Sequence, residues 1–142
     1  MSRLARGAVA GAAGAAVWGA AEPLLKRVFG TPYSDVRLLG AAVTRGRAWP
    51  FVGLGFHVAN GALFGLLWAR LGGGGWKRAV AAAQLENLAL WGPGMALVDR
   101  YHPDRRSGVL PPLLRNQRVF AQEIATHAIF GVVLGLLASS EQ

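Results

Sequence analysis

Four long apolar stretches, separated by polar segments, dominate the pattern along this chain. They predict helices at about residues 5–25, 50–71, 77–99 and 116–139. Each stretch is close to the roughly 20 residues that a helix needs to cross a bilayer. Polar connectors occupy residues 26–49 and 99–117. The pattern therefore predicts an all-α protein, an integral membrane four-helix bundle in which residues 1–142 form a single transmembrane domain.

The second and fourth stretches contain the same phrase. His57-x3-Gly61-x3-Gly65-Leu-Leu returns as His127-x3-Gly131-x3-Gly135-Leu-Leu. Residues four apart share one face of a helix, so each copy carries an imidazole above a face almost without side chains. We interpret the chain as two pseudo-repeated transmembrane hairpins in the same orientation.

Small residues at a spacing of four also mark the first stretch. Gly7, Gly11, Ala15 and Gly19 form a ladder of the kind that lets membrane helices pack closely. The glycines expected to serve helix packing are Gly7, Gly11, Gly19, Gly61, Gly65, Gly131 and Gly135. Ladders that remain exposed would also serve contacts between protomers, so a homo-oligomer or a subunit of a larger membrane complex is expected.

The connector at 26–49 predicts one short helix of its own. Ser34 is a good N-cap for a segment through Leu39, and its apolar residues suggest that it lies along the membrane surface. Arg37 would then reach lipid headgroups. Glu22 and Pro23 are expected to end the first long helix.

Composition agrees with a membrane protein. Hydrophobic residues make up 53% and charged residues 15% of the chain, against a usual charged share of about 25% in soluble domains. The formal net charge is +8, but the basic residues lie mainly in the connectors. That placement favours the lipid bilayer as the partner, and nucleic acid is not expected. Without cysteine there is neither a disulfide nor a thiolate metal site.

Several polar side chains interrupt the apolar stretches. Such residues are costly in a bilayer and usually face the bundle interior, where they mark function. The candidates for a proton or solute path are Glu22, His57, Asn60, Glu86, Asn87, Glu123 and His127. We expect Glu86 to be protonated or paired across helices with His57 or His127. A simpler interpretation is that the two histidines only hydrogen-bond across a helix interface and lock the glycine faces together.

Three functions are compatible with these residues. The first is movement of protons or a small solute through an intramembrane His/Glu cluster. The second is a structural or assembly role without a substrate. The third is a b-type haem protein with His57 and His127 as axial ligands, although no cofactor is required by the other two. The sequence has no nucleophile–base pattern and no phosphate loop, so neither catalytic residues nor enzyme activity is expected, nor is a metal site.

The chain also resembles the YagU-type family of bacterial inner-membrane proteins. The resemblance rests on Trp18-Gly19-Ala-Ala-Glu22-Pro23-Leu24, on the Phe/Gly run that begins at His57, on the Trp76 entry to an Ala-rich helix, and on Glu123-x3-His127. The connector at 26–49 lacks the long insertion of that family. Membership implies an uncharacterised multi-pass protein of the inner (plasma) membrane with a suggested part in acid tolerance. It also implies Glu22, His57, Glu123 and His127 as the positions to test.

Overall fold

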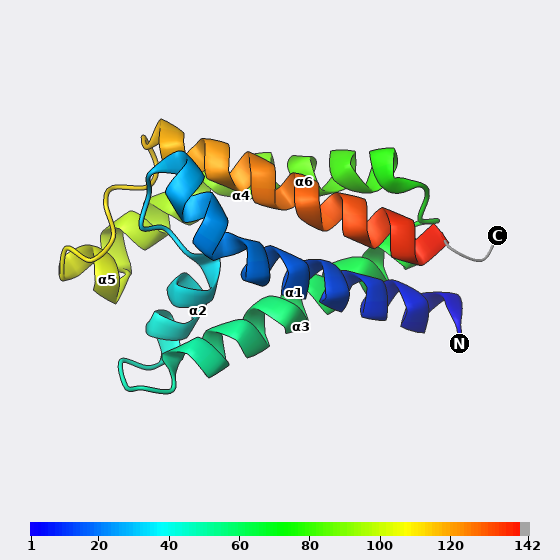
Figure 1. The fold of residues 1–142 in the computed structure, drawn as a ribbon, viewed down its shortest axis with the longest axis horizontal. Helices are drawn as coiled ribbons and strands as arrows, with labels where there is room; N and C mark the ends of the chain where they lie inside the picture. The colour runs from blue at the N-terminus through cyan, green and yellow to red at the C-terminus, as the bar shows by residue number, and fades with distance from the viewer. Residues whose placement is uncertain (140–142) are drawn as a thin grey trace.

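The computed structural model describes residues 1–139, and all regular structure within them is helical. The helices are α1 (Arg3–Phe29), α2 (Asp35–Val43), α3 (Trp49–Arg70), α4 (Trp76–Tyr101), α5 (Pro103–Arg106) and α6 (Gln117–Ser139). Four of them are long, and they correspond to the four apolar stretches of the sequence (Figure 1).

The first helix is longer than the 5–25 that its sequence predicts. Ser2 caps its start by accepting a hydrogen bond from the Ala5 amide (3.2 Å), and Gly30 ends it with a left-handed φ of 61°. Pro23 lies inside α1 and does not terminate it. A proline removes one backbone hydrogen bond and bends a helix, but tertiary contacts can carry the helix past it. The expected end at Glu22 and Pro23 was therefore wrong.

Three helices within residues 1–139 are long and apolar enough to cross a membrane: α1, α3 and α6. The fourth long helix, α4, has 26 residues but is not one of them. Its middle carries Gln84, Glu86 and Asn87, which lower its hydropathy. Of the four membrane-spanning helices that the sequence predicts, three therefore have the length and composition of a membrane span.

The long helices pack in the order α3, α1, α6, α4. The extensive contacts join α1 to α3, α1 to α6 and α4 to α6, while α2 covers one end of α3. Figure 1 shows α2, α5 and their loops at one end of the molecule, and the start of α1 and the end of α6 at the other. Because α3 and α4 are the outer members of this order, they are free to diverge and leave space between them.

Glycine allows α1 and α3 to touch along their backbones. A side chain at Gly11 would collide with the Gly61 carbonyl, and one at Gly7 would collide with the Gly65 carbonyl. The reverse is also true, since side chains at Gly61 and Gly65 would strike the α1 backbone. Close backbone approach of this kind is how membrane helices gain packing energy without a hydrophobic driving force.

The second glycine pair serves a different interface. Gly131 lies against the Val80 backbone and Gly135 against the Trp76 backbone, which joins α6 to α4. The glycine face of α3 packs on α1 and that of α6 packs on α4, so the two faces do not meet. The histidines therefore do not lock these two faces to each other, although His127 does contact Glu86 across the α6–α4 interface, at 3.2 Å.

Two further expectations about small residues need correction. A Cβ on Gly19 would meet Leu54 at an ordinary 3.6 Å, so Gly19 makes no close helix contact. The ladder of Gly7 and Gly11 is used inside the chain and is not available to a second protomer. Gly14, which packs against the Phe130 ring, is the α1 glycine that contacts α6.

The short helix α2 is a packed element and not a free surface helix. Ser34 caps it, as expected, by accepting from the Arg37 amide at 3.1 Å. Gly40 and Gly53 bring the α2 and α3 backbones into direct contact. Arg37 forms an ion pair with Asp104 at 2.6 Å, so the protein itself supplies a partner for this guanidinium.

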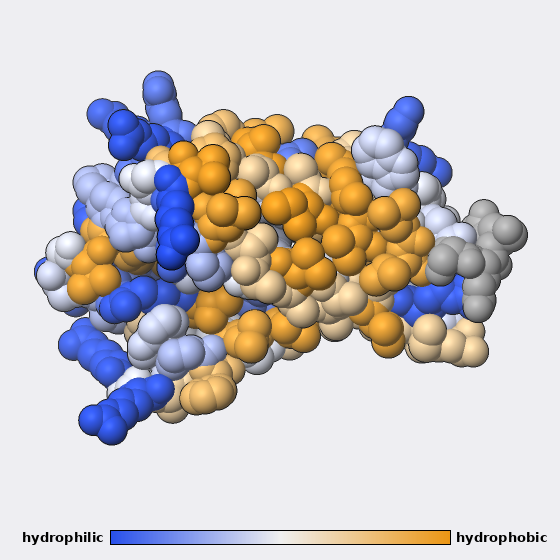
Figure 2. Space-filling view, viewed as in Figure 1, coloured by the Kyte–Doolittle hydropathy of each residue, from blue (hydrophilic) through white to orange (hydrophobic). Residues whose placement is uncertain are grey.

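The surface divides into an apolar middle and charged ends. Figure 2 shows hydrophobic residues across the central part of the molecule and hydrophilic residues concentrated at its two ends. Large exposed apolar side chains such as Phe51, Leu63, Leu85 and Leu136 contribute to the apolar area. An apolar band between polar ends is the pattern that a lipid bilayer requires of a protein surface.

A polar cavity between α3 and α4

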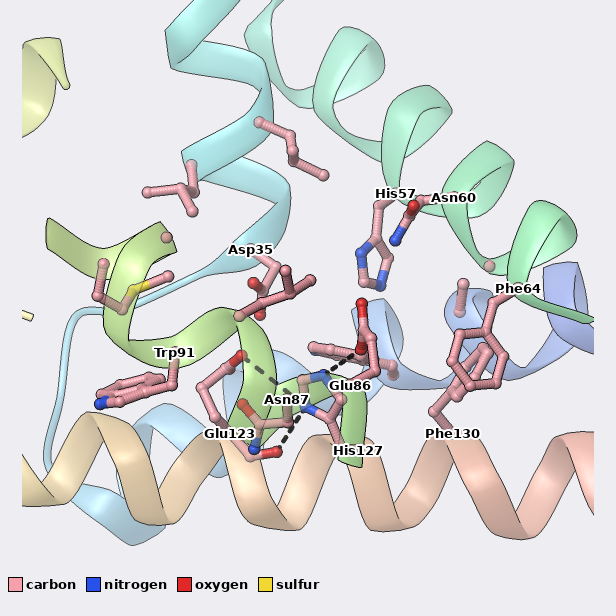
Figure 3. A pocket seen from close by; sticks show the side chains of 18 of the residues that line it. Asp35, His57, Asn60, Phe64, Glu86, Asn87, Trp91, Glu123, His127 and Phe130 are labelled. Carbon is pink, nitrogen blue, oxygen red and sulfur yellow. Dashed lines mark hydrogen bonds and ion pairs between the residues drawn. The ribbon is translucent and has the colours of Figure 1, made fainter. Parts of the chain in front are cut away.

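A cavity of about 290 Å³ lies where α3 and α4 diverge, and α1, α2 and α6 complete its wall (Figure 3). Polar and titratable side chains gather on one part of the wall, and aromatic and aliphatic side chains form the rest. Leu90, near the middle of α4, lines the cavity and is 56% exposed. We therefore expect access to the cavity from the side of the molecule, beside α4.

The centre of the polar wall is a pair between α6 and α4. His127 Nε2 lies 3.2 Å from Glu86 Oε2, and this interaction is drawn in Figure 3. The other ring nitrogen, Nδ1, lies 2.8 Å from the Glu123 carbonyl oxygen and 3.9 Å from a Glu123 carboxylate oxygen. Of the two partners that the sequence offered for Glu86, the structure selects His127. The imidazole is thus placed between two carboxyl groups.

The carboxyl group of Asp35, in the first turn of α2, extends this polar wall towards α2. The carboxyl groups of Glu123 and Asp35 both line the cavity and are close enough to interact electrostatically. Asp35 Oδ1 accepts a hydrogen bond from the Tyr33 hydroxyl at 2.8 Å, whereas Oδ2 is buried and has no donor.

The phenol at this end of the wall is fully enclosed. Burial raises the pKa of Tyr33 well above its ordinary value, and the neighbouring Asp35 carboxylate raises it further. Tyr33 therefore remains a hydrogen-bond donor to Asp35 throughout the physiological pH range. The bond from Tyr33 occupies Oδ1 of Asp35, and the other carboxylate oxygen, Oδ2, stays buried without a partner.

One indole ring contacts both histidines. The centroid of the Trp18 ring lies 4.8 Å from that of His57 and 4.6 Å from that of His127. His57 is buried, and its Nε2 has no hydrogen-bond partner. The repeated histidines thus approach the same cavity from α3 and α6, although they do not bond to each other directly.

Four buried polar atoms on the cavity wall have no hydrogen-bond partner within residues 1–139. They belong to Trp18 (Nε1), Asp35 (Oδ2), His57 (Nε2) and Asn87 (Nδ2). Buried polar atoms in proteins are nearly always paired, and each orphan costs about 1–3 kcal/mol. Four such atoms around one space indicate that the cavity holds water or a polar ligand in the working protein.

The cavity brings together six of the seven residues that the sequence singled out: His57, Asn60, Glu86, Asn87, Glu123 and His127. Glu22 is the exception. Its carboxylate accepts hydrogen bonds from the Ser34 hydroxyl and from the Asp35 and Val36 amides, the last two at 2.8 and 3.3 Å. Glu22 therefore holds the start of α2 and does not line the cavity.

Sequence reasoning missed Tyr33 and Asp35. Both lie in the polar connector, where a tyrosine and an aspartate after a proline indicate only a turn and a helix start. The available signal was the capping pattern at Ser34, which placed Asp35 in the first turn of a helix. Only the packing of α2 onto α3 carries that turn to the cavity.

The haem alternative depends on how the two imidazoles are placed. Two axial histidines must direct free ring nitrogens at one iron. His127 already has a partner at each nitrogen, Glu86 and the Glu123 backbone, and the Trp18 ring packs against both imidazoles. Within residues 1–139, no group of three His, Cys, Asp or Glu side chains is arranged to hold a metal ion.

No protein-family model matches the chain, and no curated protein or solved structure matches it at a significant level.

Proposed function

We propose that this protein is a non-enzymatic, multi-pass membrane protein that moves protons or a small solute through the cavity between α3 and α4. The observation that carries the proposal is the set of four buried, unpartnered polar atoms around a cavity that also contains carboxyl and imidazole groups. Ionisable groups inside a membrane are expensive, and they are typical of ion and solute pathways. The YagU-type resemblance is the reason for placing the protein in the bacterial inner membrane.

The architecture proposed with this function is a four-helix bundle of two related hairpins. Two interfaces support it. Gly61 and Gly65 of α3 pack on α1, and Gly131 and Gly135 of α6 pack on α4, so each repeated glycine pair joins its helix to the preceding long helix. In both halves the histidine lies one turn before the first glycine and faces the cavity. This equivalence is what two copies of one hairpin would produce.

The proposed proton route follows the polar wall. It begins at Asp35, near the end of the molecule that carries α2 and the connectors, and passes to Glu123, His127 and Glu86. Successive groups are close: Asp35 and Glu123 are close enough to interact electrostatically, Glu123 and His127 are 3.9 Å apart, and His127 and Glu86 are 3.2 Å apart. Carboxyl and imidazole groups at such distances pass protons directly or through one water molecule.

The test is a flux measurement on purified protein in liposomes. The vesicles contain a pH-sensitive dye, and an imposed pH gradient is followed with valinomycin and potassium to prevent charge build-up. We expect faster proton equilibration than in protein-free vesicles, and a large reduction in the Glu86→Gln and Glu123→Gln variants. Because a solute other than a proton is also proposed, the same vesicles are tested for uptake of radiolabelled small solutes under the same gradient.

The matched control is Gln84→Ala. Gln84 lies on α4 two residues before Glu86, and its amide donates to the Ile124 carbonyl of α6 at 2.7 Å, so its loss perturbs the same interface without altering the cavity wall. Transport by this variant should match the wild type. If wild-type vesicles move neither protons nor any tested solute faster than empty vesicles, the transport proposal fails and the structural role takes its place.

A further inference from the structure

We propose that the solute bound in this cavity is a small amphipathic amine, that is, a protonated amino group on an apolar body. This inference rests on the proposed function, because it names the class of solute for the same cavity. Its chemical basis is the combination of carboxyl groups, aromatic rings and expected access from the side at one site.

The charge of the cavity wall is the first argument. The chain as a whole has a formal net charge of +8, yet none of the residues that line the cavity within 1–139 is a lysine or arginine. The wall carries the carboxyl groups of Asp35, Glu86 and Glu123 against the imidazoles of His57 and His127. A cation is attracted to such a wall, and an anion is repelled by it.

The second argument concerns the unpartnered atoms. Asp35 Oδ2 is a buried acceptor without a donor, and an ammonium group supplies up to three donors. Asn87 is 4% exposed and His57 is 5% exposed, so these side chains are more than nine-tenths buried while each has an unpartnered nitrogen at the cavity. Water or an oxygen atom of the ligand satisfies the amide donor of Asn87.

The third argument is the apolar remainder of the wall. The aromatic rings that line the cavity belong to Trp18, Tyr33, Phe64, Trp91 and Phe130. Aromatic faces attract a desolvated cation and also pack against an apolar body. In Figure 3, Trp91 and Phe64 lie on opposite sides of the cluster formed by Asp35, Glu86 and His127. A ligand with a charged end and an apolar end meets both parts of this wall.

Size and access complete the argument. A cavity of 290 Å³ holds about ten waters at their share of liquid volume, which suits a molecule with one small ring and a short chain. Leu90 and Glu86 line the cavity near the middle of α4 and are partly exposed, and the neighbouring Leu85 and Leu88 of α4 are exposed apolar side chains. An amphipathic amine partitions into the bilayer interface and would reach the cavity from this side.

The experiment compares three probes of nearly equal size by titration calorimetry on the purified protein in lipid nanodiscs. The probes are 2-phenylethylamine, 2-phenylethanol and phenylacetate, which are cationic, neutral and anionic at pH 7. Empty nanodiscs correct for partition into lipid. We expect the amine to bind at least about tenfold more tightly than the alcohol, and phenylacetate to show no binding.

Variants then locate the site. Asp35→Asn should weaken amine binding by about tenfold or more, and Glu86→Gln should weaken it as well, while the Gln84→Ala control binds like the wild type. Circular dichroism and thermal unfolding confirm that each variant is folded. Because Asp35 also bonds to Tyr33, Glu86→Gln provides the test if the Asp35 variant is unstable. Equal affinity for amine and alcohol, or wild-type affinity in Glu86→Gln, overturns the inference.

Flux and binding can fail separately. If protons move through the wild type and the amine does not bind, the inference is wrong and the proposed function stands. If the amine binds and neither protons nor the amine cross the vesicle membrane, the cavity is a binding site for amines and the transport proposal is wrong.

Discussion

The imidazole of His127 bridges two helices by lying 3.2 Å from the Glu86 carboxylate while its other nitrogen contacts the Glu123 carbonyl at 2.8 Å. One ring thereby connects the middle of α4 to its own helix, α6, at the wall of the cavity. This relationship determines where the charges of the cavity lie, and it can be tested independently of transport.

A double-mutant cycle should detect coupling between Glu86 and His127. We expect Glu86→Gln and His127→Gln each to lower the free energy of unfolding, and the double variant to lose less than the sum of the two. The coupling energy should be about 0.5–1 kcal/mol, since Glu86 is one-third exposed and the pair is partly screened. Denaturant or thermal unfolding in detergent measures it. Strict additivity would show that the two groups do not interact.

Gly61 should tolerate no side chain. A Cβ there would collide with the α1 backbone at Gly11 and with the Ala15 methyl group, so Gly61→Leu should separate α1 from α3. The loss should be about 1–3 kcal/mol or more, seen as a lower melting temperature. Gly55→Leu is the matched control, because Gly55 lies on the same helix and has nothing within 4 Å. Similar stability of the two variants would contradict the close contact.

Glu22 should affect stability and not transport. Glu22→Ala removes the acceptor of the Asp35 and Val36 amides and of the Ser34 hydroxyl, leaving them without this partner at the start of α2. We expect a loss of about 1–3 kcal/mol in unfolding free energy. Ser2→Ala removes an exposed cap and should cost less. The proton flux per folded molecule of the Glu22→Ala variant should equal that of the wild type. A lower flux per folded molecule would show that Glu22 takes part in transport.

Tyr33 should not ionise near pH 10 while the protein is folded. Burial and Asp35 raise its pKa above the ordinary value of 10.0, so the folded state holds the proton and the unfolded state releases it. The contribution of Tyr33 to the free energy of unfolding is therefore fully present below pH 10, and it decreases as the pH rises above 10. In a spectrophotometric titration, Tyr33→Phe should leave the phenolate absorbance at pH 10.5 unchanged. A drop in that absorbance would mean that Tyr33 is accessible.

The sequence could predict the helices because their signals are local. Runs of apolar residues near bilayer length and the four-residue spacing of histidine and glycine depend only on the geometry of one helix. The face shared by His57, Gly61 and Gly65 follows directly from that geometry, and so does the equivalent face that begins at His127. Six of the seven candidate polar residues reached the cavity for the same reason: a polar side chain in an apolar helix must face inward.

Only the tertiary structure decided which faces meet. The glycines of α3 and α6 pack on different helices, which leaves α3 and α4 apart and creates the cavity. Glu22 is a carboxylate in an apolar helix, which by itself suggests a pathway residue. The fold instead places it at the start of α2, where it accepts hydrogen bonds from three donors. Asp35 follows a turn and begins a short helix, which by itself suggests only a local role. The packing of α2 instead brings its carboxyl group to the cavity, near Glu123. Neither outcome is visible in the local pattern, because each depends on contacts between segments that are distant along the chain.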